Sequence, residues 1–174
     1  MKILTEIHRR AGINIKGKTV HRTAVRGAIL RGRNLLMVYS STVGDYKFPG
    51  GGVSEGETHA QALSREIREE CGTSLTHIGD AIGAVVEYNI LMESEYEVFK
   101  MTSHYYQCDV GEGFGHQKLD GYEQALGFKP VWVHIDDAIL ANGSLLNSNQ
   151  QPEWLRREIF ILKYIKENLL ESQL

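Results

Sequence analysis

The sequence predicts an α/β protein folded as a layered α/β/α sandwich. Strand-length apolar segments recur along most of the chain, one amphipathic helix interrupts them, and a second, longer helix follows them. Strands with helices both between and after them favour a sheet covered by helices on its two faces. With 174 residues, 42% of them hydrophobic, the chain is expected to form a single domain over residues 1–174 that buries about 70% of its extended-chain surface.

The first expected elements form a β-hairpin. Residues 23–30 predict a strand, residues 31–34 a turn, and residues 35–40 the returning strand. Further strands are predicted at residues 82–91, 98–110 and 128–135. The hairpin therefore precedes the central helix, and three more strands follow it.

Clear signals bound the central helix. Thr58 followed by Gln61 is a capping-box pattern that starts the helix at His59, and Gly72 suits a left-handed C-terminal residue. The expected buried stripe consists of residues spaced three and four apart, namely Ala60, Leu63, Ile67 and Cys71.

Two helices are expected near the C-terminus. Asp136 is predicted to cap a short helix that ends near Asn142 and Gly143. Pro152 is predicted to begin a long helix through about residue 170. The apolar face of this long helix consists of Leu155, Ile159, Leu162 and Leu169.

Three carboxylates crowd one flank of the central helix. At about 100° per residue, Glu66 and Glu70 lie side by side, and Glu69 lies about 60° beyond Glu66. Because like charges one turn apart repel, a cation is expected to neutralise them. Ligands that are all oxygens favour a hard divalent ion, which indicates Mg²⁺ with Mn²⁺ as a possible substitute.

The segment just before this helix, from Phe48 to Gly52, contains Pro49 and three consecutive glycines. Backbone without side chains lets carbonyls or amides approach a metal or a diphosphate closely. Each piece alone has an ordinary interpretation, since REIREE is typical of a solvated charged face and a glycine run is typical of a turn. Their joint spacing favours the functional interpretation.

The run GGVSEGETHAQALSREIREECGT, which begins at Gly51, resembles the signature of the Nudix (MutT-like) hydrolases. The positions that carry the resemblance are Gly51, Glu57, Arg65, Glu66, Glu69, Glu70 and Gly72. Thr73 departs from the family pattern, which usually has an aliphatic residue there. The specific match covers about residues 20–140, and an N-terminal extension (1–18) and the C-terminal helix (152–170) lie outside it. The resemblance implies a Nudix-type α/β/α sandwich with a mixed β-sheet.

The resemblance also implies a function. A Nudix enzyme uses Mg²⁺ to hydrolyse the pyrophosphate linkage of a nucleoside diphosphate joined to a moiety X, by attack of water on phosphorus. By this resemblance the metal ligands are Glu66, Glu69, Glu70 and the Gly50 carbonyl. Glu66 is the first choice as general base and Glu69 the second.

Other residues receive supporting roles. By resemblance Glu57 and Arg65 pair to lock the loop against the helix, and a further catalytic glutamate comes from a distant loop. Glu112 and Glu123 are the candidates for that glutamate, with Glu123 preferred. Arg26 and Lys47 are candidates for binding substrate phosphates, with plain surface charges as the slightly favoured alternative for each. Tyr46 and Phe48 are candidates for stacking on a base, with plain packing as the alternative.

Two other functional classes stay open. A Nudix-like sensor would bind a nucleotide or metabolite without turnover, although the intact Glu66, Glu69 and Glu70 argue against it. Isoprenoid diphosphate isomerisation would need a cysteine and a glutamate in the pocket, for which Cys108 and Glu112 are the candidates. The added signatures of several substrate subclasses are missing, which leaves X open with a mild preference for nucleoside triphosphates.

Composition narrows the partners and the location. With 19 basic and 22 acidic residues and a net charge of −3, duplex nucleic acid is disfavoured. Two cysteines without metal-ligand spacing fit a reducing cytoplasm. The N-terminus is too polar for a signal peptide, and no segment is apolar enough to span a membrane. The expected partner is a small nucleotide, and a homodimer through residues 99–106 or the C-terminal helix stays open.

Overall fold

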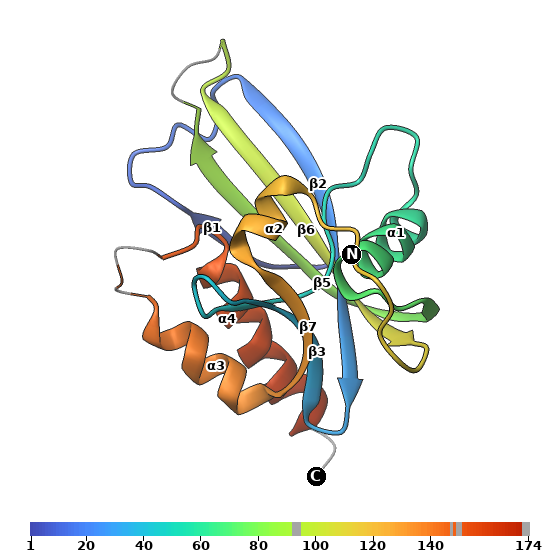
Figure 1. Ribbon diagram of the computed structural model, residues 1–174. Helices are drawn as coiled ribbons and strands as arrows, with labels where there is room; N and C mark the ends of the chain where they lie inside the picture. The colour runs from blue at the N-terminus through green and yellow to red at the C-terminus, as the bar shows by residue number, and fades with distance from the viewer. Residues whose placement is uncertain (92–94, 147, 149–150, 172–174) are drawn as a thin grey trace.

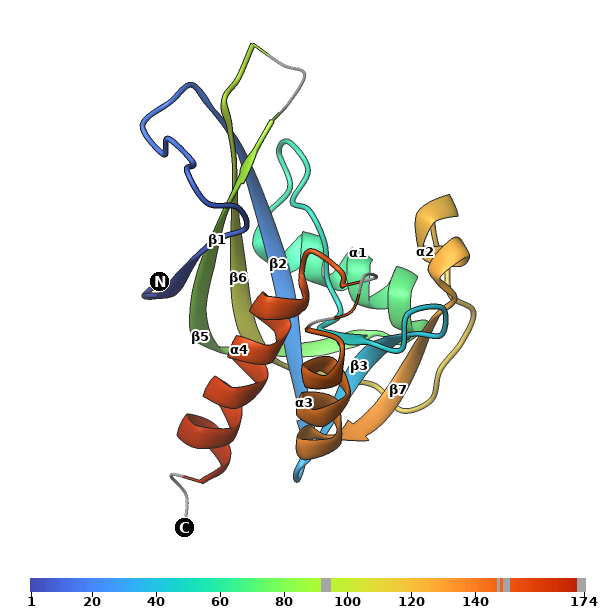
Figure 2. The ribbon, with the colours of Figure 1, turned by 90° about the vertical axis from the view of Figure 1, so that its left-hand side faces the viewer.

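In a computed structural model, the structure describes residues 1–91, 95–146, 148 and 151–171. In these ranges a seven-stranded sheet lies between helix α1 (His59–Cys71) on one face and helices α3 (Ile135–Ser144) and α4 (Leu155–Ile165) on the other (Figures 1 and 2). The layered α/β/α sandwich expected from the sequence is confirmed. No helix in the described ranges is both long and apolar enough to cross a membrane.

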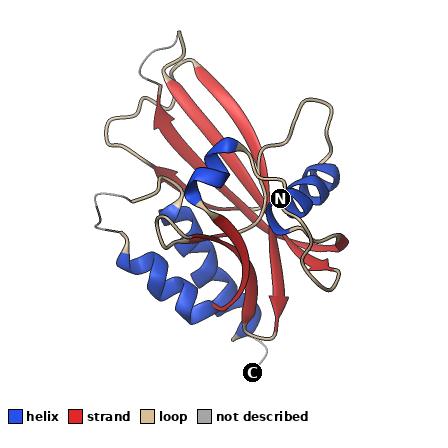
Figure 3. Cartoon of the chain, in the orientation of Figure 1, coloured by secondary structure: helices blue, strands red, loops and turns tan. Residues whose placement is uncertain are grey.

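The sheet is mixed, as predicted, and its strands are coloured red in Figure 3. The order is β1-β5-β6-β2-β3-β4, and β7 pairs with the other side of β3. The β1·β5 and β2·β6 pairs are parallel, whereas the others are antiparallel. The strands are β1 (Ile3–His8), β2 (Thr19–Arg31), β3 (Asn34–Ser40), β4 (Tyr46–Lys47), β5 (Leu75–Ile90), β6 (Val98–Val110) and β7 (Phe128–His134).

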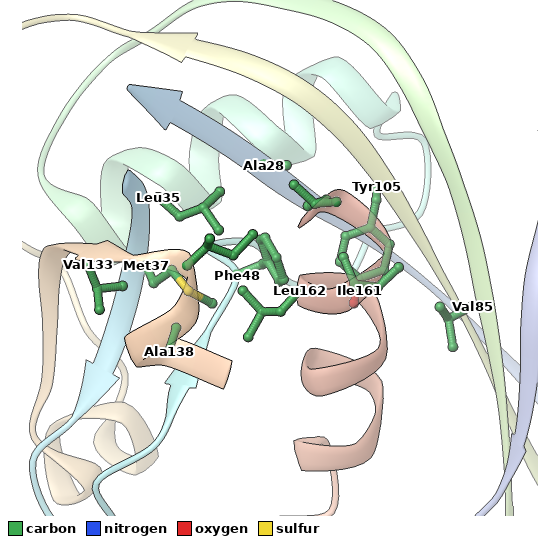
Figure 4. Close-up of a cluster of buried hydrophobic side chains, with 12 residues drawn as sticks. Ala28, Leu35, Met37, Phe48, Val85, Tyr105, Val133, Ala138, Ile161 and Leu162 are labelled. Atoms are coloured by element: carbon green, nitrogen blue, oxygen red, sulfur yellow. The ribbon is translucent and has the colours of Figure 1, made fainter. Parts of the chain in front are cut away.

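Each face of the sheet has its own core, because side chains alternate along a strand. On β3, Leu35 and Met37 belong to the cluster that includes residues of α3 and α4, part of which is drawn in Figure 4. Their neighbours Leu36 and Val38 belong to the cluster packed against α1. The central strands are therefore buried on both faces and hold the two helical layers at fixed positions.

Helix α1 begins and ends where the sequence predicts. Thr58 and Gln61 form both bonds of the capping box, and Gly72 closes the helix with φ of 64°. The predicted stripe is wrong at its first member, because Ala60 is exposed and Ala62 is buried instead. At about 100° per residue, Ala62 lies on the carboxylate side of Leu63, so the buried arc is turned toward Glu66 and Glu70.

The N-terminal half contains more strand than predicted. Residues 3–8 form β1 on the edge of the sheet, in parallel register with β5. This pairing depends on a partner some 80 positions away, which no local pattern reveals. The first hairpin strand starts at Thr19 rather than residue 23, and β5 starts at Leu75 rather than residue 82.

The C-terminal helices differ from the predictions at their starts. The N-cap of α3 is His134, whose ring nitrogen accepts the Asp136 N–H, so Asp136 lies in the first turn and is not the cap. Helix α4 starts at Leu155, three residues after Pro152, and continues into a π-helical turn over residues 166–170. Helix α2 (Gly121–Leu126) contains Glu123, which the sequence analysis placed on a distant loop.

Both segments proposed for a dimer take part in the fold of the chain itself. Strand β6, which contains residues 99–106, is paired on both edges, by β5 and β2. The apolar face of α4 contributes Ile161, Leu162 and Ile165 to the core below the sheet. Both segments are used for folding of the chain itself.

Candidate active site

A cavity of about 640 Å³ lies between α1, β2 and the glycine loop, defined here as residues 48–52. Helix α2 and the residue before α4 complete its wall. The lining brings together residues of the predicted site that are far apart in sequence, namely Arg26, Lys47, Gly50, Gly51, Arg65, Glu66, Glu69, Glu70 and Glu123. The structure thus gathers nearly all predicted polar residues in one place.

Arg65 ties the segment between the glycine loop and α1 to the helix itself. Its Nε and Nη2 donate to the two carboxylate oxygens of Glu57 at 2.8 and 2.9 Å, and Nη2 also donates to the Gly52 carbonyl at 3.0 Å. The guanidinium lowers the pKa of Glu57 to about 2, with help from the Ser54 N–H. A bidentate pair of this kind fixes direction as well as distance.

Glu70 is the most deeply buried carboxylate of the cavity, with 1% of its surface exposed. Its Oε2 accepts the Gly50 N–H at 2.7 Å, and its Oε1 lies 2.6 Å from Lys47 Nζ. The Gly50 carbonyl in turn accepts a hydrogen bond from Arg26. Gly50 has φ of 136°, and a Cβ there would lie 2.9 Å from the Arg26 Cα, so only glycine fits.

Glu66 faces the next glycine of the loop. A Cβ on Gly51 would lie within 2.6 Å of both Glu66 carboxylate oxygens, so the bare backbone leaves the space that this carboxylate fills. Burial raises the pKa of Glu66, and the negative charge of Glu70 acts in the same direction against the lowering effect of Arg65. Arg65 also bridges Glu66 and Glu69, at 2.7 and 3.3 Å.

Glu123 reaches the cavity from α2. Its carboxylate accepts the Asp120 N–H at 2.9 Å, and Asp120 accepts the Glu123 N–H at 2.8 Å, which forms a capping box. Burial raises the pKa of Glu123, and the charge of Glu70 adds to this effect. The alternative candidate, Glu112, lines a separate surface depression beside Gly72. Of the two candidates, only Glu123 lies in the cavity with the helix carboxylates.

The two aromatic candidates of β4 and the glycine loop lie outside the cavity lining. Successive residues of a strand point to opposite faces, so Lys47 faces the cavity while Tyr46 packs against the core below the sheet and the ring of Tyr39. Phe48 is fully buried and meets Tyr105 edge to face at 5.5 Å between ring centroids. For Phe48 the packing alternative is the one observed.

The cavity also contains residues that the sequence analysis missed. Arg22 lies on the same face of β2 as Ala24 and Arg26, a relation that strand alternation could have revealed. Other missed lining residues are Lys118, Asp120, Tyr122 and Trp154. The Asp120-x-x-Glu123 capping box was a readable signal for α2. Trp154 had no local signal, because its approach depends on how α4 packs.

The donor chemistry of the cavity fits a divalent ion. All the candidate ligand atoms are oxygens, from three carboxylates of one helix and one glycine carbonyl. Because Gly51 has no Cβ, the Glu66 carboxylate can lie close to the loop. As they stand, the described residues hold no group of three His, Cys, Asp or Glu side chains with metal-site geometry. Lys47 and Arg65 instead neutralise the carboxylates. The Lys47 ammonium is carried on a flexible four-carbon chain, and Arg65 contacts Glu66 and Glu69 through Nη1 alone while its other nitrogens hold Glu57 and Gly52.

Comparison with known proteins agrees with this fold and motif. Residues 20–156 match the NUDIX domain family, so the chain belongs to the Nudix family. Among individual proteins, it is 34% identical over 76 residues to "Putative 8-oxo-dGTP diphosphatase 2" of two Mycobacterium tuberculosis strains. That match covers 40% of this chain and 54% of the relatives' length.

Among solved structures, a "NUDIX hydrolase from Nitrosomonas europaea" aligns with a TM-score of 0.55 and 18% identity. The alignment covers 82% of this chain and 90% of that chain. The E. coli ORF135 protein aligns with a TM-score of 0.48 and 19% identity, over 77% of this chain and 96% of that chain. The first of these likenesses supports the fold assignment.

Proposed function

We propose that this chain is a metal-dependent pyrophosphohydrolase that cleaves a nucleoside diphosphate linked to a moiety X by attack of water on phosphorus. The observation that carries the proposal is the arrangement of Glu66, Glu69 and Glu70, which line one cavity with the bare backbone of Gly50 and Gly51. Oxygen ligands beside exposed backbone suit a metal that is shared with substrate phosphates. Family membership supports the same reaction class.

In this proposal the metal is Mg²⁺, with Mn²⁺ as a substitute, held by Glu66, Glu69, Glu70 and the Gly50 carbonyl. When bound, such an ion neutralises phosphate charge and lowers the pKa of a bound water. Glu66 is the preferred base, and Glu69 and Glu123 are the other carboxylates within the cavity. Glu57 and Arg65 keep the loop and the helix in register.

Cationic side chains of the cavity are suited to phosphate oxygens. Arg22 and Arg26 lie on one face of β2, Lys47 comes from β4, and Lys118 comes from the segment before α2. A guanidinium group can bind two phosphate oxygens at once through parallel N–H donors, whereas an ammonium acts as a point charge. We assign these side chains to substrate binding, whereas Tyr46 has no contact with the cavity that would support such a role.

Aromatic side chains at the same cavity support a nucleoside triphosphate as the substrate. Tyr122, which is 58% exposed, meets Trp154 edge to face at 6.4 Å between ring centroids, and both line the cavity. The Trp154 indole N–H is already bonded to Asp45 at 2.7 Å, which fixes the ring and leaves its π surface for a base. The name of the Mycobacterium tuberculosis relatives makes oxidised guanine triphosphates the first to test.

The alternatives have less support. Isomerisation would require Cys108 and Glu112 near the carboxylates, but neither lines that cavity, and burial raises the pKa of Cys108 to about 12. The intact Glu66, Glu69 and Glu70 in the cavity argue against a sensor without turnover. We further propose a small-molecule partner, no duplex nucleic acid, and a cytoplasmic location, on the charge balance and the two buried free cysteines.

The test is a hydrolysis screen with Mg²⁺ over nucleoside triphosphates, nucleotide sugars and dinucleoside polyphosphates. Glu66→Gln and Glu70→Gln should each lower the rate by roughly 10² to 10⁴. Glu112→Gln is the matched control, because this glutamate lies outside the cavity, and it should leave the rate unchanged. Full turnover in both cavity variants would reject the assigned site, and tight nucleotide binding without turnover in the unmodified protein would favour a sensor.

A further inference from the structure

The glycine loop is held by three different elements. Strand β2 donates a backbone N–H to the Pro49 carbonyl at 2.9 Å, and α1 supplies Glu70, which accepts the Gly50 N–H at 2.7 Å. The third element is α4, whose Glu158 carboxylate accepts the Phe48 N–H at 2.9 Å. Because proline has no N–H, the Phe48 amide is the last backbone donor before Gly50. The orientation of the Phe48 N–H is therefore set by Glu158 of α4, on the far side of the sheet.

Helix α4 covers the face of the sheet opposite α1 (Figure 2), and Figure 4 shows Phe48 in the same cluster as Leu162 of α4. Glu158 thus approaches the glycine loop from behind the cavity. The cavity lining includes Glu70 but not Glu158. The hydrogen bond from the Phe48 N–H is the direct contact between the Glu158 side chain and the loop backbone.

A buried ionic chain orients the Glu158 carboxylate. Arg157 donates to its Oε1 from Nη2 at 2.7 Å and from Nε at 3.0 Å, and the remaining Arg157 Nη1 lies 2.5 Å from Glu87 of β5. Glu87 also pairs with Arg9, which follows β1, at 3.1 Å. Glu158, Arg157 and Glu87 are 0%, 2% and 1% exposed. Three of the four charges in this chain are buried, and Arg9 at its outer end is partly exposed.

A neutral acceptor would satisfy one backbone N–H, yet the chain buries three charges around this contact and pairs them with the partly buried Arg9. Buried charges are tolerated only when they are well paired, and they fix geometry more than they add stability. A charge-assisted hydrogen bond is also shorter and stronger than a neutral one. The arrangement is therefore suited to holding one peptide group in a single orientation.

We propose that Glu158, oriented by Arg157, is a positioning residue that fixes the Lys47–Phe48 peptide, at the entry of the glycine loop, and thereby sets the position of the Gly50 carbonyl in the cavity. The effect on rate rests on the proposed function, since it assumes that the Gly50 carbonyl takes part in metal binding. The effect on the loop itself does not. Exchange of the Phe48 amide proton reports on the loop whether or not a substrate is known.

The experiment compares three variants in the same Mg²⁺ assay, with amide hydrogen exchange measured beside it. Glu158→Met removes the acceptor, and Glu87→Met is the matched control, equally buried and in the same ionic chain but without contact to the loop. The double variant Arg157→Met/Glu158→Gln keeps an amide oxygen for the Phe48 N–H while it removes the charge pair. Should Glu158→Met fail to fold, Glu158→Gln replaces it. In the wild type one Glu158 oxygen accepts from Arg157 and the other from the Phe48 N–H, and the glutamine side chain has an oxygen in only one of these two positions.

Glu158→Met should lower kcat by roughly 10- to 100-fold, as expected when a reacting group is displaced by about 1 Å, with little change in KM. Its Phe48 amide should exchange faster. Glu87→Met should lose stability to a similar degree, while kcat per folded molecule and the exchange at Phe48 stay near the wild-type level, because Arg157 Nε and Nη2 still hold Glu158. The double variant should fall between Glu158→Met and the wild type in both measurements, because it keeps an acceptor but loses the charge pair. Equal kcat per folded molecule in Glu158→Met and Glu87→Met, or equal protection of the Phe48 amide, would overturn the proposal. Loss of the proposed function alone would leave the exchange difference intact.

Discussion

A single methyl group added at Gly51 should separate catalysis from folding. Gly51 has no left-handed φ, so alanine fits its backbone, but the new Cβ would lie within 2.6 Å of both oxygens of Glu66. Ordinary contact begins near 3.4 Å, so the carboxylate must move by about 1 Å, a displacement that can cost on the order of 10²-fold in rate. We expect Gly51→Ala to fold normally and to lose about this much activity.

The neighbouring glycines provide matched controls for this prediction. At Gly52 the added Cβ would meet the end of the Arg22 side chain at 2.9 Å, and a flexible side chain can move away. Gly52→Ala should therefore have a much smaller effect on kcat, and the displacement of Arg22 should change KM instead. At Gly50 the backbone itself forbids a side chain, with φ of 136°, so Gly50→Ala should lower the thermal midpoint as well as the activity.

The assay is the initial rate of Mg²⁺-dependent hydrolysis of a nucleoside triphosphate, combined with thermal unfolding followed by circular dichroism. The reasoning requires Gly51→Ala to differ from Gly52→Ala in kcat but not in stability. If Gly51→Ala kept the wild-type kcat, the observed position of the Glu66 carboxylate would not matter for catalysis.

Three further predictions follow from single contacts. In the metal-free protein, carbon NMR should show the Glu57 carboxylate titrating with a pKa of about 2, and Arg65→Met should return this pKa to the ordinary range for glutamate. Because the pKa is lowered in the folded state, the Glu57–Arg65 pair stabilises the fold fully above the ordinary pKa. That stabilisation is lost as the pH falls through about 2. Thr73→Val removes the hydroxyl that donates to the Gly111 carbonyl at 3.1 Å. Chemical denaturation should show that the free energy of unfolding falls by about 1 kcal/mol, while the rate of hydrolysis stays unchanged. An unchanged free energy of unfolding would contradict the role of this bond. In a Trp132→Phe background, nucleotide binding should quench the fluorescence of Trp154, and an unresponsive spectrum at saturating nucleotide would place the base elsewhere.

The Thr73 prediction refines what the sequence suggested. By resemblance Thr73 stands where the family usually has an aliphatic residue. The structure shows a buried side chain whose hydroxyl bonds to the segment after β6. The substitution is therefore neutral for the reaction but not for folding.

Local signals predicted the parts of the site that lie close together in sequence. The capping box at Thr58, the left-handed Gly72 and the spacing of the three carboxylates all follow from one helix of known pitch, so they could be read without a partner. The same helix shows the limit of such reading. The side of the helix that is buried depends on how the helix packs on the sheet. The prediction that Ala60 belongs to the buried stripe was therefore wrong.

Sequence alone determined the family motif, the layered α/β/α class and the identity of the carboxylates, because helix pitch, strand alternation and capping act over a few residues. Tertiary structure decided which remote side chains complete the cavity, from Arg22 on β2 to Glu123 on α2 and Trp154 before α4. It also decided that Tyr46 faces the core and that Glu158 holds the glycine loop from behind. Such contacts join residues up to 110 positions apart, and their formation depends on how sheet and helices pack, which no local pattern encodes.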